Sequence, residues 1–400
     1  MASTKYQTVP FFLFETSWPL ARFYQINGGH FPCFKVTDEQ SGRIFLKPLE
    51  TALIIKRYSL FVLTTLVLKA LTFTCMWLTW NGLTYSDLSQ VLEKHGQSKM
   101  DFATLYAVIG VSLVGHIIIV FRNVKYKDQL AQLQDMFAQN AIIDREILKA
   151  KKKWLVIFLI LSVLLVWSGF LTFFVGMAML LNEEFSVSLH SQIPTILLNT
   201  MAIQQLFTPM YAFTNTCVET ACTISAWTET LLLTDKDLKD CYNLMQVISA
   251  TSKAMSLQLF SVVTMSVMIL IGVTFPVVSY FIVNEDLTAH YFLLFTLGIG
   301  LVAIFTIFFL VSLTSFSQKI VDKVHELGNA IRRLPVKDEK IVLEKEILEW
   351  RDFRDIVLHD MDGFEGLDGY GYFSINKSLL TSIVANFMTY VIILIDFKIN

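Results

Sequence analysis

The chain alternates between long apolar stretches and segments rich in charged residues. Read with a window of about twenty residues, seven stretches are long enough for a hydrocarbon core of about 30 Å. An apolar run of this length is typical of a membrane-spanning helix. The pattern therefore predicts an all-α membrane protein with seven transmembrane helices, at residues 58–80, 102–121, 154–181, 192–218, 257–283, 291–316 and 379–396.

The basic residues between these spans indicate the orientation. Lys and Arg gather before span one, after spans two and four, and before span seven, whereas the opposite face carries only Lys94, Lys99 and Lys398. Cytoplasmic loops of membrane proteins are enriched in Lys and Arg. We therefore expect a multi-pass protein with a cytoplasmic N-terminus and an extracellular C-terminus. A G-protein-coupled receptor has the opposite topology.

The segments on the two faces also differ in length. The predicted outer connections at 182–191 and 284–290 are short, whereas the inner segment before span seven covers 317–378. Apolar residues of the inner segments recur at helical spacing among charges, as at Ile320 and Val324. We therefore expect long helical extensions of the spans into the cytoplasm.

The composition limits the classes of function that the protein can have. Hydrophobic residues make up 54% of the chain, charged residues 16%, and the mean hydropathy is +0.55, which is too apolar for a soluble domain. A net charge of −2 argues against a nucleic-acid partner. The cysteines and histidines show no spacing typical of a metal site, and no catalytic motif occurs, so we expect no cofactor, no metal and no enzymatic activity. Cys217 and Cys222 are interpreted as packing residues.

Span seven differs from the other spans because one of its faces is polar. Its remaining surface is largely apolar, with Leu380, Ile383, Val384, Phe387 and Val391. A polar stripe within a bilayer either lines water or packs against another helix. A carboxylate near the outer end favours water, although it could instead mark the membrane interface. The stripe consists of Ser378, Ser382, Asn386, Thr389, Ile393 and Asp396.

The end of the chain carries a family-like motif. Thr389-Tyr390, the apolar residues 391–395 and Asp396-Phe397 resemble the C-terminal signature of insect-type gustatory receptors: Thr-Tyr, five hydrophobic residues and Gln-Phe. The sequence of 373–380, Phe-Ser-Ile-Asn-Lys-Ser-Leu-Leu, is also similar to that family. The seven-span layout resembles it over nearly the whole chain. The resemblance, which extends to odorant receptors, implies homotetrameric ligand-gated cation channels of the plasma membrane.

Carried over residue by residue, the resemblance implies a pore lined by the last helix. Ile393 and Phe397 become the candidate hydrophobic gate, with Asp396 beside them and Thr389 and Asn386 along the pore. An apolar constriction blocks ions by dewetting. Asp396 stands where the family has Gln, and adds one carboxylate per subunit.

The same resemblance implies a division of the chain into four functional segments. Residues 1–56 form a cytoplasmic N-terminal segment, and residues 57–316 form transmembrane helices one to six with a ligand pocket. Residues 317–372 form cytoplasmic anchor helices between subunits, and residues 373–400 form the pore-lining helix.

A small-molecule tastant is expected to enter among the outer halves of spans two to six. Sugar receptors of the family typically have an acidic residue at the position of Val391, which disfavours that branch but leaves a sugar as one candidate ligand. Permeant cations and membrane lipid are the other expected partners. Candidate lining residues combine aromatic faces with hydrogen-bonding groups; they are Tyr106, Trp167, Thr195, Asn199, Tyr280 and Tyr291.

Two other function classes stay open at this point. A secondary transporter would more often show repeated halves or broken spans with midplane charges, and Lys69 within span one is a weak indication of transport. Another type of seven-helix receptor is the second alternative. The sequence leaves open the ligand, the ion selectivity, homomeric or heteromeric assembly, and a light or temperature stimulus.

Overall fold

The computed structural model describes residues 6–8, 34–38 and 44–48, single positions between 52 and 136, and residues 142–185, 188–233, 238–283, 290–333 and 344–399. Predicted spans one and two lie mostly outside these residues. The helices are α7 (Arg145–Phe185), α8 (Leu189–Leu233), α9 (Leu238–Val283), α10 (His290–Arg332), α11 (Glu344–Asp362) and α12 (Lys377–Ile399). The strands are β1 (Tyr6–Thr8), β2 (Phe34–Asp38), β3 (Ile44–Pro48), β4 (Ile142–Asp144), β5 (Leu367–Asp368) and β6 (Ser374–Ile375).

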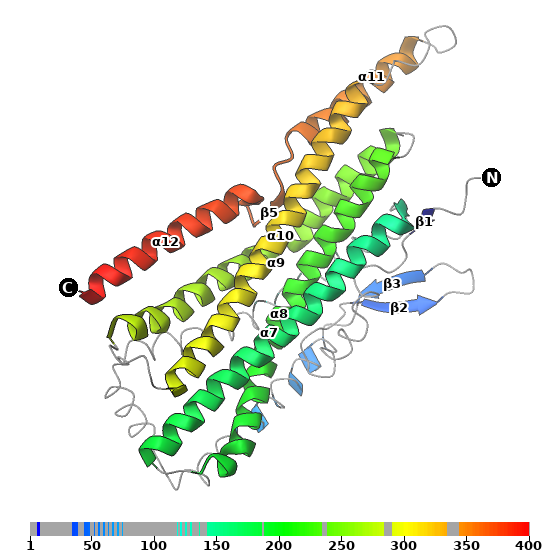
Figure 1. Ribbon diagram of the computed structural model, residues 1–400. Coiled ribbons are helices and arrows are strands. Elements are labelled where there is room, and N and C mark those ends of the chain that lie inside the picture. Colours follow the sequence, from blue (N-terminus) through cyan, green and yellow to red (C-terminus); the bar gives the residue numbers. More distant parts are fainter. Residues whose placement is uncertain are drawn as a thin grey trace.

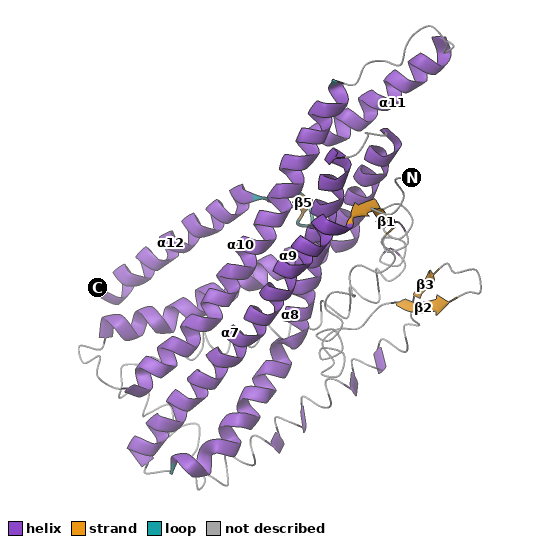
Figure 2. Ribbon diagram, turned by 45° about the vertical axis from the view of Figure 1, so that its right-hand side comes forward, coloured by secondary structure: helices purple, strands orange, loops and turns teal. Residues whose placement is uncertain are grey.

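The helices α7 to α10 are far longer than a membrane requires. They contain 41, 45, 46 and 43 residues, which at 1.5 Å per residue gives about 60–70 Å, roughly twice the hydrocarbon thickness. Figures 1 and 2 show them side by side, with α11 against the far end of α10. Predicted spans three to six lie within these helices, and the expected helical extensions are confirmed.

The beginning of α7 is fixed to α8. Asp144 caps α7 by accepting a hydrogen bond from the backbone N–H of Glu146 at 2.8 Å. Its own N–H donates to Oγ1 of Thr230 in α8 at 3.0 Å. Asp144 is also the last residue of β4, which pairs in antiparallel register with β1, with Tyr6 opposite Asp144.

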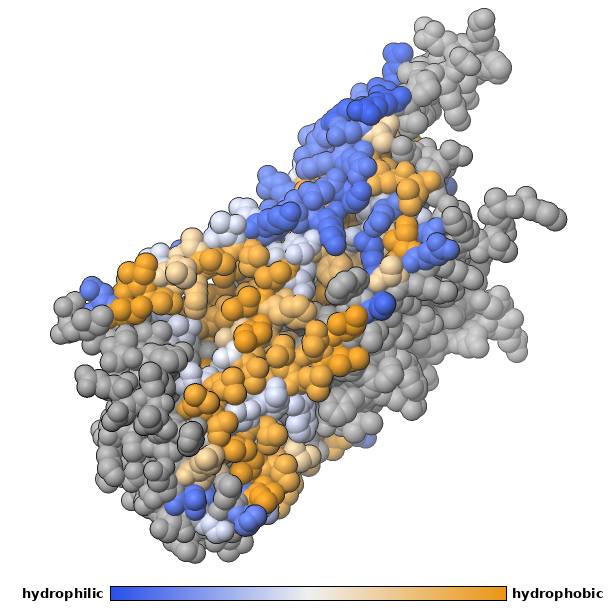
Figure 3. Space-filling model, in the orientation of Figure 1, coloured by the Kyte–Doolittle hydropathy of each residue, from blue (hydrophilic) through white to orange (hydrophobic). Residues whose placement is uncertain are grey.

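The main hydrophobic core lies largely at one end of the bundle. It is formed by the C-terminal half of α8, most of α9, the second half of α10, α11 and the strands β5 and β6. Trp227 is its largest fully buried side chain. Figure 3 shows the surface at this end to be mainly hydrophilic, which is the pattern of a water-soluble folding unit. Cys217 and Cys241 belong to this core, and Cys222 is buried beside it in the sequence of α8, which agrees with the interpretation of Cys217 and Cys222 as packing residues.

The other part of the bundle has an apolar surface. Leu164 of α7, Leu197 of α8 and Ile304 of α10 are more than half exposed, and Figure 3 shows a wide hydrophobic area over these helices. A large exposed apolar surface of this kind requires lipid or a partner. Within the described residues, Leu238–Gly272 and Thr296–Arg332 are long and apolar enough to span a membrane by length and composition.

Short strands supplement the all-α fold. β2 pairs with β3, and β5 pairs with β6 between α11 and α12. The Gly-rich residues 363–371 contain β5 and part of the turn toward β6, and Gly366 and Gly371 have φ values of 139° and 74°. A side chain is strained at such angles, which explains the glycines.

Candidate pore helix

Helix α12 packs against the rest of the chain through one sector only. Leu379, Leu380, Ile383 and Phe387 are half-buried against the core, and the contacting helices are α9 and α10. Figures 1 and 2 show α12 beside the bundle, beginning at the β5–β6 hairpin and ending at the C-terminus.

The predicted polar stripe is exposed over its whole length. At 100° per residue its members fall within one sector of about 80°, adjacent to the packed sector. The hydroxyls of Ser382 and Thr389 donate to the backbone carbonyls of Ser378 and Ala385, each at 3.0 Å. The exposed members are Ser378, Ser382, Asn386, Thr389, Ile393 and Asp396.

Asp396 sets a stricter requirement on the surroundings of this stripe than the hydroxyls do. A hydroxyl can be satisfied by a carbonyl of its own helix, but an ionised carboxylate only accepts hydrogen bonds. The N–H groups inside an α-helix are already used by the helix itself. The carboxylate of Asp396 is therefore satisfied by groups other than the backbone of its own helix, and it is costly to expose to lipid.

A third sector of α12 is apolar and exposed. Val384, Met388, Ile392 and Ile395 lie on it. The sequence placed Val384 with Ile383 and Phe387 in one apolar remainder, whereas the structure divides that remainder into a packed sector and an exposed sector. Each turn of α12 therefore presents three environments, which are the protein core, an apolar boundary and a polar boundary.

The predicted gate residues are only partly placed. Ile393 is 62% exposed on the polar stripe, and Asp396 lies one turn beyond it. The side chain of Phe397 lies outside the described residues. A gate formed by Ile393 and Phe397 stays a prediction.

The predicted ligand-pocket residues are described to different extents. Trp167 is half-buried in the middle of α7, and Thr195 is buried near the beginning of α8. Asn199, Tyr280 and Tyr291 belong to α8, α9 and α10 respectively, but their side chains and all of Tyr106 lie outside the described part of the chain. Near Thr195, the buried Gln192 donates its amide N–H to the carbonyl of Ala178 in α7 at 3.1 Å. This bond joins the ends of α7 and α8, and sequence reasoning did not find it.

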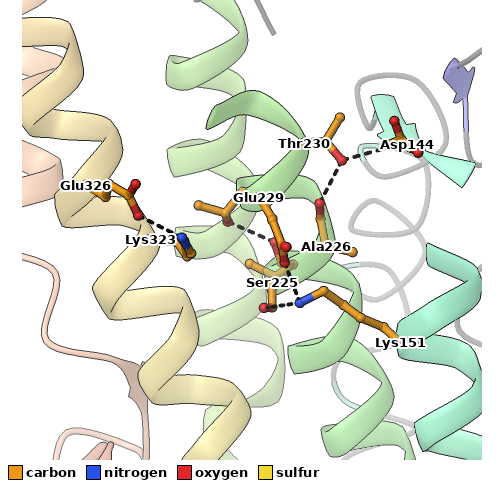
Figure 4. A network of polar contacts seen from close by, with 10 residues as sticks. Asp144, Lys151, Ser225, Ala226, Glu229, Thr230, Lys323 and Glu326 are labelled. Atoms are coloured by element: carbon orange, nitrogen blue, oxygen red, sulfur yellow. Dashed lines mark hydrogen bonds and ion pairs between the residues drawn. The ribbon is translucent and has the colours of Figure 1, made fainter. Parts of the chain in front are cut away.

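Charged residues of three helices lie near one another at the hydrophilic end of the bundle (Figure 4). Lys151 of α7 lies 2.9 Å from a carboxylate oxygen of Glu229 in α8 and donates to Oγ of Ser225 at 3.0 Å. On α10, Lys323 pairs with Glu326 at 2.8 Å. The hydrogen bond with Glu326, reinforced by the nearby Glu229, raises the pKa of Lys323 above its ordinary value of 10.5. These ion pairs join α7 to α8 and link two turns within α10, and none of them involves a residue of α12.

The beginning of α12 is defined by a side-chain cap. Asn376 accepts a hydrogen bond from the N–H of Leu379 at 3.1 Å, and its amide donates to the carbonyl of Glu365 at 3.2 Å. Asn is a preferred N-cap residue because its oxygen satisfies a free N–H of the first turn. Asn376, three residues before the apolar run that begins at Leu379, was a sequence signal for this cap, which the pattern analysis did not use.

Comparison with known proteins places the chain in a family. Residues 55–400 match the 7tm chemosensory receptor family. The fold is similar to that of the insect olfactory receptor OR5 from Machilis hrabei in complex with eugenol, with a TM-score of 0.57, 12% identity and coverage of 96% of this chain and 98% of the receptor. The structure of OR5 without a named ligand gives a TM-score of 0.55, again with 12% identity, covering 94% and 97% of the two chains. Among curated proteins, no sequence matches. The family match over most of the chain, supported by the shared seven-helix membrane fold, shows that this protein belongs to the 7tm chemosensory receptor family.

Proposed function

We propose that this protein is a gustatory receptor that acts as a ligand-gated, non-selective cation channel. In the proposed assembly, four identical subunits surround a central pore, and α12 of each subunit lines it. The C-terminal signature and the family membership support this proposal. The observation that carries it is the exposed polar stripe of α12.

The stripe supports a pore because of what surrounds each sector of α12. The packed sector is covered by α9 and α10. The polar sector carries hydroxyl, amide and carboxylate groups that are costly to expose to lipid, whereas the apolar sector at Val384 and Ile392 suits lipid or a protein neighbour. A ring of identical subunits meets both requirements, since the polar sectors face a common axis and the apolar sectors face neighbouring subunits.

The distribution of basic residues indicates which end of the helix bundle lies in the cytoplasm. We place the protein in the plasma membrane, with the hydrophilic end of the bundle and the N-terminus in the cytoplasm. In this arrangement 1–56 is the cytoplasmic N-terminal segment and 57–316 holds the first six spans. The anchor segment 317–372 begins inside the uninterrupted α10, so a movement of α10 displaces both the sixth span and the beginning of the anchor segment. Residues 373–400 form the pore segment.

The proposed ligand is a small-molecule tastant bound toward the extracellular side. The helices α7, α8 and α10 pack against one another; α7 supplies Trp167, and α8 supplies Thr195 and Asn199. Tyr106, Tyr280 and Tyr291 complete the candidate set. The complex of OR5 with eugenol supports a small organic ligand for this fold, and a sugar is one class to test.

The experiment is current recording from cells that express the full chain, during application of sugars, alkaloids and small aromatic compounds. An active compound should evoke a cation current that reverses near 0 mV in symmetrical salt. Asp396→Asn should lower the Ca²⁺ to Na⁺ permeability ratio, because a carboxylate near the pore mouth attracts divalent cations. The control Asp360→Asn removes an exposed carboxylate of α11 and should leave the ratio unchanged.

The outcomes separate the alternatives. An unchanged permeability ratio in Asp396→Asn would place this residue outside the pore. Substrate uptake with a saturating current and no unitary steps would favour a secondary transporter. Second-messenger signalling without a direct current would favour another type of seven-helix receptor.

A further inference from the structure

The polar contacts at the base of α12 connect it to α10 through the preceding hairpin. β5 and β6 pair through Leu367 with Ile375 and Asp368 with Ser374. A Cβ atom on Gly366 would lie 2.6 Å from the carbonyl oxygen of Ile375. The hairpin is therefore closed too tightly to accept a side chain at this position.

Ser317 of α10 is bonded to both strands of this hairpin. Its hydroxyl donates to the carbonyl of Ile375 and accepts from the N–H of Leu367 at 3.4 Å. All three residues are buried. Buried hydrogen bonds of this kind are expensive to break because no water replaces the lost partner. One hydroxyl thus holds the hairpin against α10.

The next residue of α10 holds α12 itself. The side-chain oxygen of Gln318 accepts a hydrogen bond from the N–H of Lys377, the first residue of α12, at 3.2 Å. The amide nitrogen of Gln318 donates to Asp322 at 2.8 Å, which fixes the orientation of the amide. A further bond, from the N–H of Asp368 to Oγ of Ser252 at 3.3 Å, ties the hairpin to α9.

These bonds lie at one end of a helix that becomes less covered toward the other end. Ile393 is sixteen residues from Lys377, or roughly 24 Å along the helix axis. A tilt of about 5° about the first turn would therefore move Ile393 by about 2 Å. A small change in the hydrogen bonds of Ser317 and Gln318 would therefore cause a larger displacement at the position of the proposed gate.

We propose that Ser317 and Gln318 are positioning residues, which set the direction of α12 relative to α10 and pass movements of α10 to the pore helix. The proposal rests on the proposed function in assigning the pore to α12. It identifies the point of transmission as backbone hydrogen bonds at the base of α12. Ordinary side-chain packing along α12 would not require either residue.

The test measures the distance between α10 and α12 directly. Nitroxide labels are introduced as an unnatural amino acid at Ile307 of α10 and Ile392 of α12, which are 48% and 62% exposed. Labelled chains are diluted with unlabelled chains, so that only distances within one subunit are recorded by pulsed electron resonance. Thermal unfolding of the same particles is measured in parallel.

Ser317→Ala and Gln318→Met should each shift or broaden the distance distribution by about 2 Å or more, with the larger effect in the double variant. The matched control is Ser312→Ala, because the hydroxyl of Ser312 donates to the carbonyl of Phe308, within its own helix. Gln318→Glu combined with Asp322→Asn should restore the wild-type distribution, because the two polar partners are exchanged and the acceptor for Lys377 is kept.

A lower melting temperature with an unchanged distance distribution would overturn the proposal, because it would assign these residues to stability alone. An unchanged distribution with unchanged stability would overturn it equally. If Ser317→Ala does not yield a folded particle, the variants of the half-buried Gln318 decide the test. Gln318→Met should then change the distance distribution, and Gln318→Glu combined with Asp322→Asn should restore it. The distance measurement needs neither ligand nor current, so a failure of the channel proposal is seen separately, in the recordings.

Discussion

The contact between α7 and α10 gives a prediction whose size follows from the structure. Gly298 of α10 faces Gly169 of α7. A Cβ atom on Gly298 would lie 2.6 Å from the carbonyl oxygen of Gly169 and 2.7 Å from the backbone nitrogen of Phe173. The nearer contact is about 0.8 Å shorter than an ordinary contact of 3.4 Å. Both atoms belong to the backbone, so no side-chain rotation can relieve the clash, and the helices must separate.

Gly300, two residues further along the same helix, is the matched control. A Cβ atom there meets nothing within 4 Å. Both Gly298→Ala and Gly300→Ala gain up to about 1 kcal/mol of helix propensity, so this gain cancels in their comparison. Overpacking costs about 1–3 kcal/mol. We therefore expect Gly298→Ala to be less stable than Gly300→Ala by about 1–3 kcal/mol.

The assay is thermal unfolding of the full chain in detergent, with both variants and Gly169→Ala. The added Cβ of Gly169→Ala would lie 2.9 Å from the carbonyl oxygen of Gly298, so its melting temperature should fall between the other two. The unfolding entropy grows with chain length, so in a chain of 400 residues 1 kcal/mol corresponds to about 1 °C, and a difference of about 1–4 °C is expected. Equal melting temperatures for Gly298→Ala and Gly300→Ala would refute the close packing of α7 on α10.

Three further predictions concern helix ends. Lys151→Met should destabilise the protein by about 1 kcal/mol in thermal unfolding, because Glu229, which is 38% exposed, loses its charged partner but keeps access to water, and Lys151→Arg should retain most of the stability. Asn376→Ala should cost about 1 kcal/mol through loss of the α12 cap, whereas Asn376→Ser should cost less; equal effects would exclude capping. The raised pKa of Lys323 means that its pairing with Glu326 contributes fully below pH 10.5 and is lost as the pH rises through the folded-state value. The difference in melting temperature between wild type and Lys323→Met should therefore be constant from pH 6 to 9 and decrease only in more alkaline solution.

Much of the architecture could be predicted because it depends on local patterns. Apolar runs locate spans three to seven, and helical spacing in the charged segments predicts that the spans continue beyond the membrane. The polar stripe of α12 was predicted from residue spacing and is exposed as a unit. These features are encoded within one helix, where the 3.6-residue period relates sequence to position.

Features that depend on distant residues could not be predicted in the same way. Ser317 and Ile375 are 58 residues apart, and Lys151 and Ser225 are 74 apart, so no local pattern indicates that they meet. Hydrophobicity likewise cannot separate Ile383 from Val384, because both suit a membrane helix. Packing against α9 and α10 covers the first and leaves the second exposed.

The central claim is that α12 lines a pore shared by several subunits, and the most direct measurement is the mass and symmetry of the purified particle. The account predicts four chains of 45.7 kDa around a four-fold axis, with the stripe from Ser378 to Asp396 facing that axis. A stable monomer, or an assembly in which α12 lies at the lipid-facing perimeter, would contradict it.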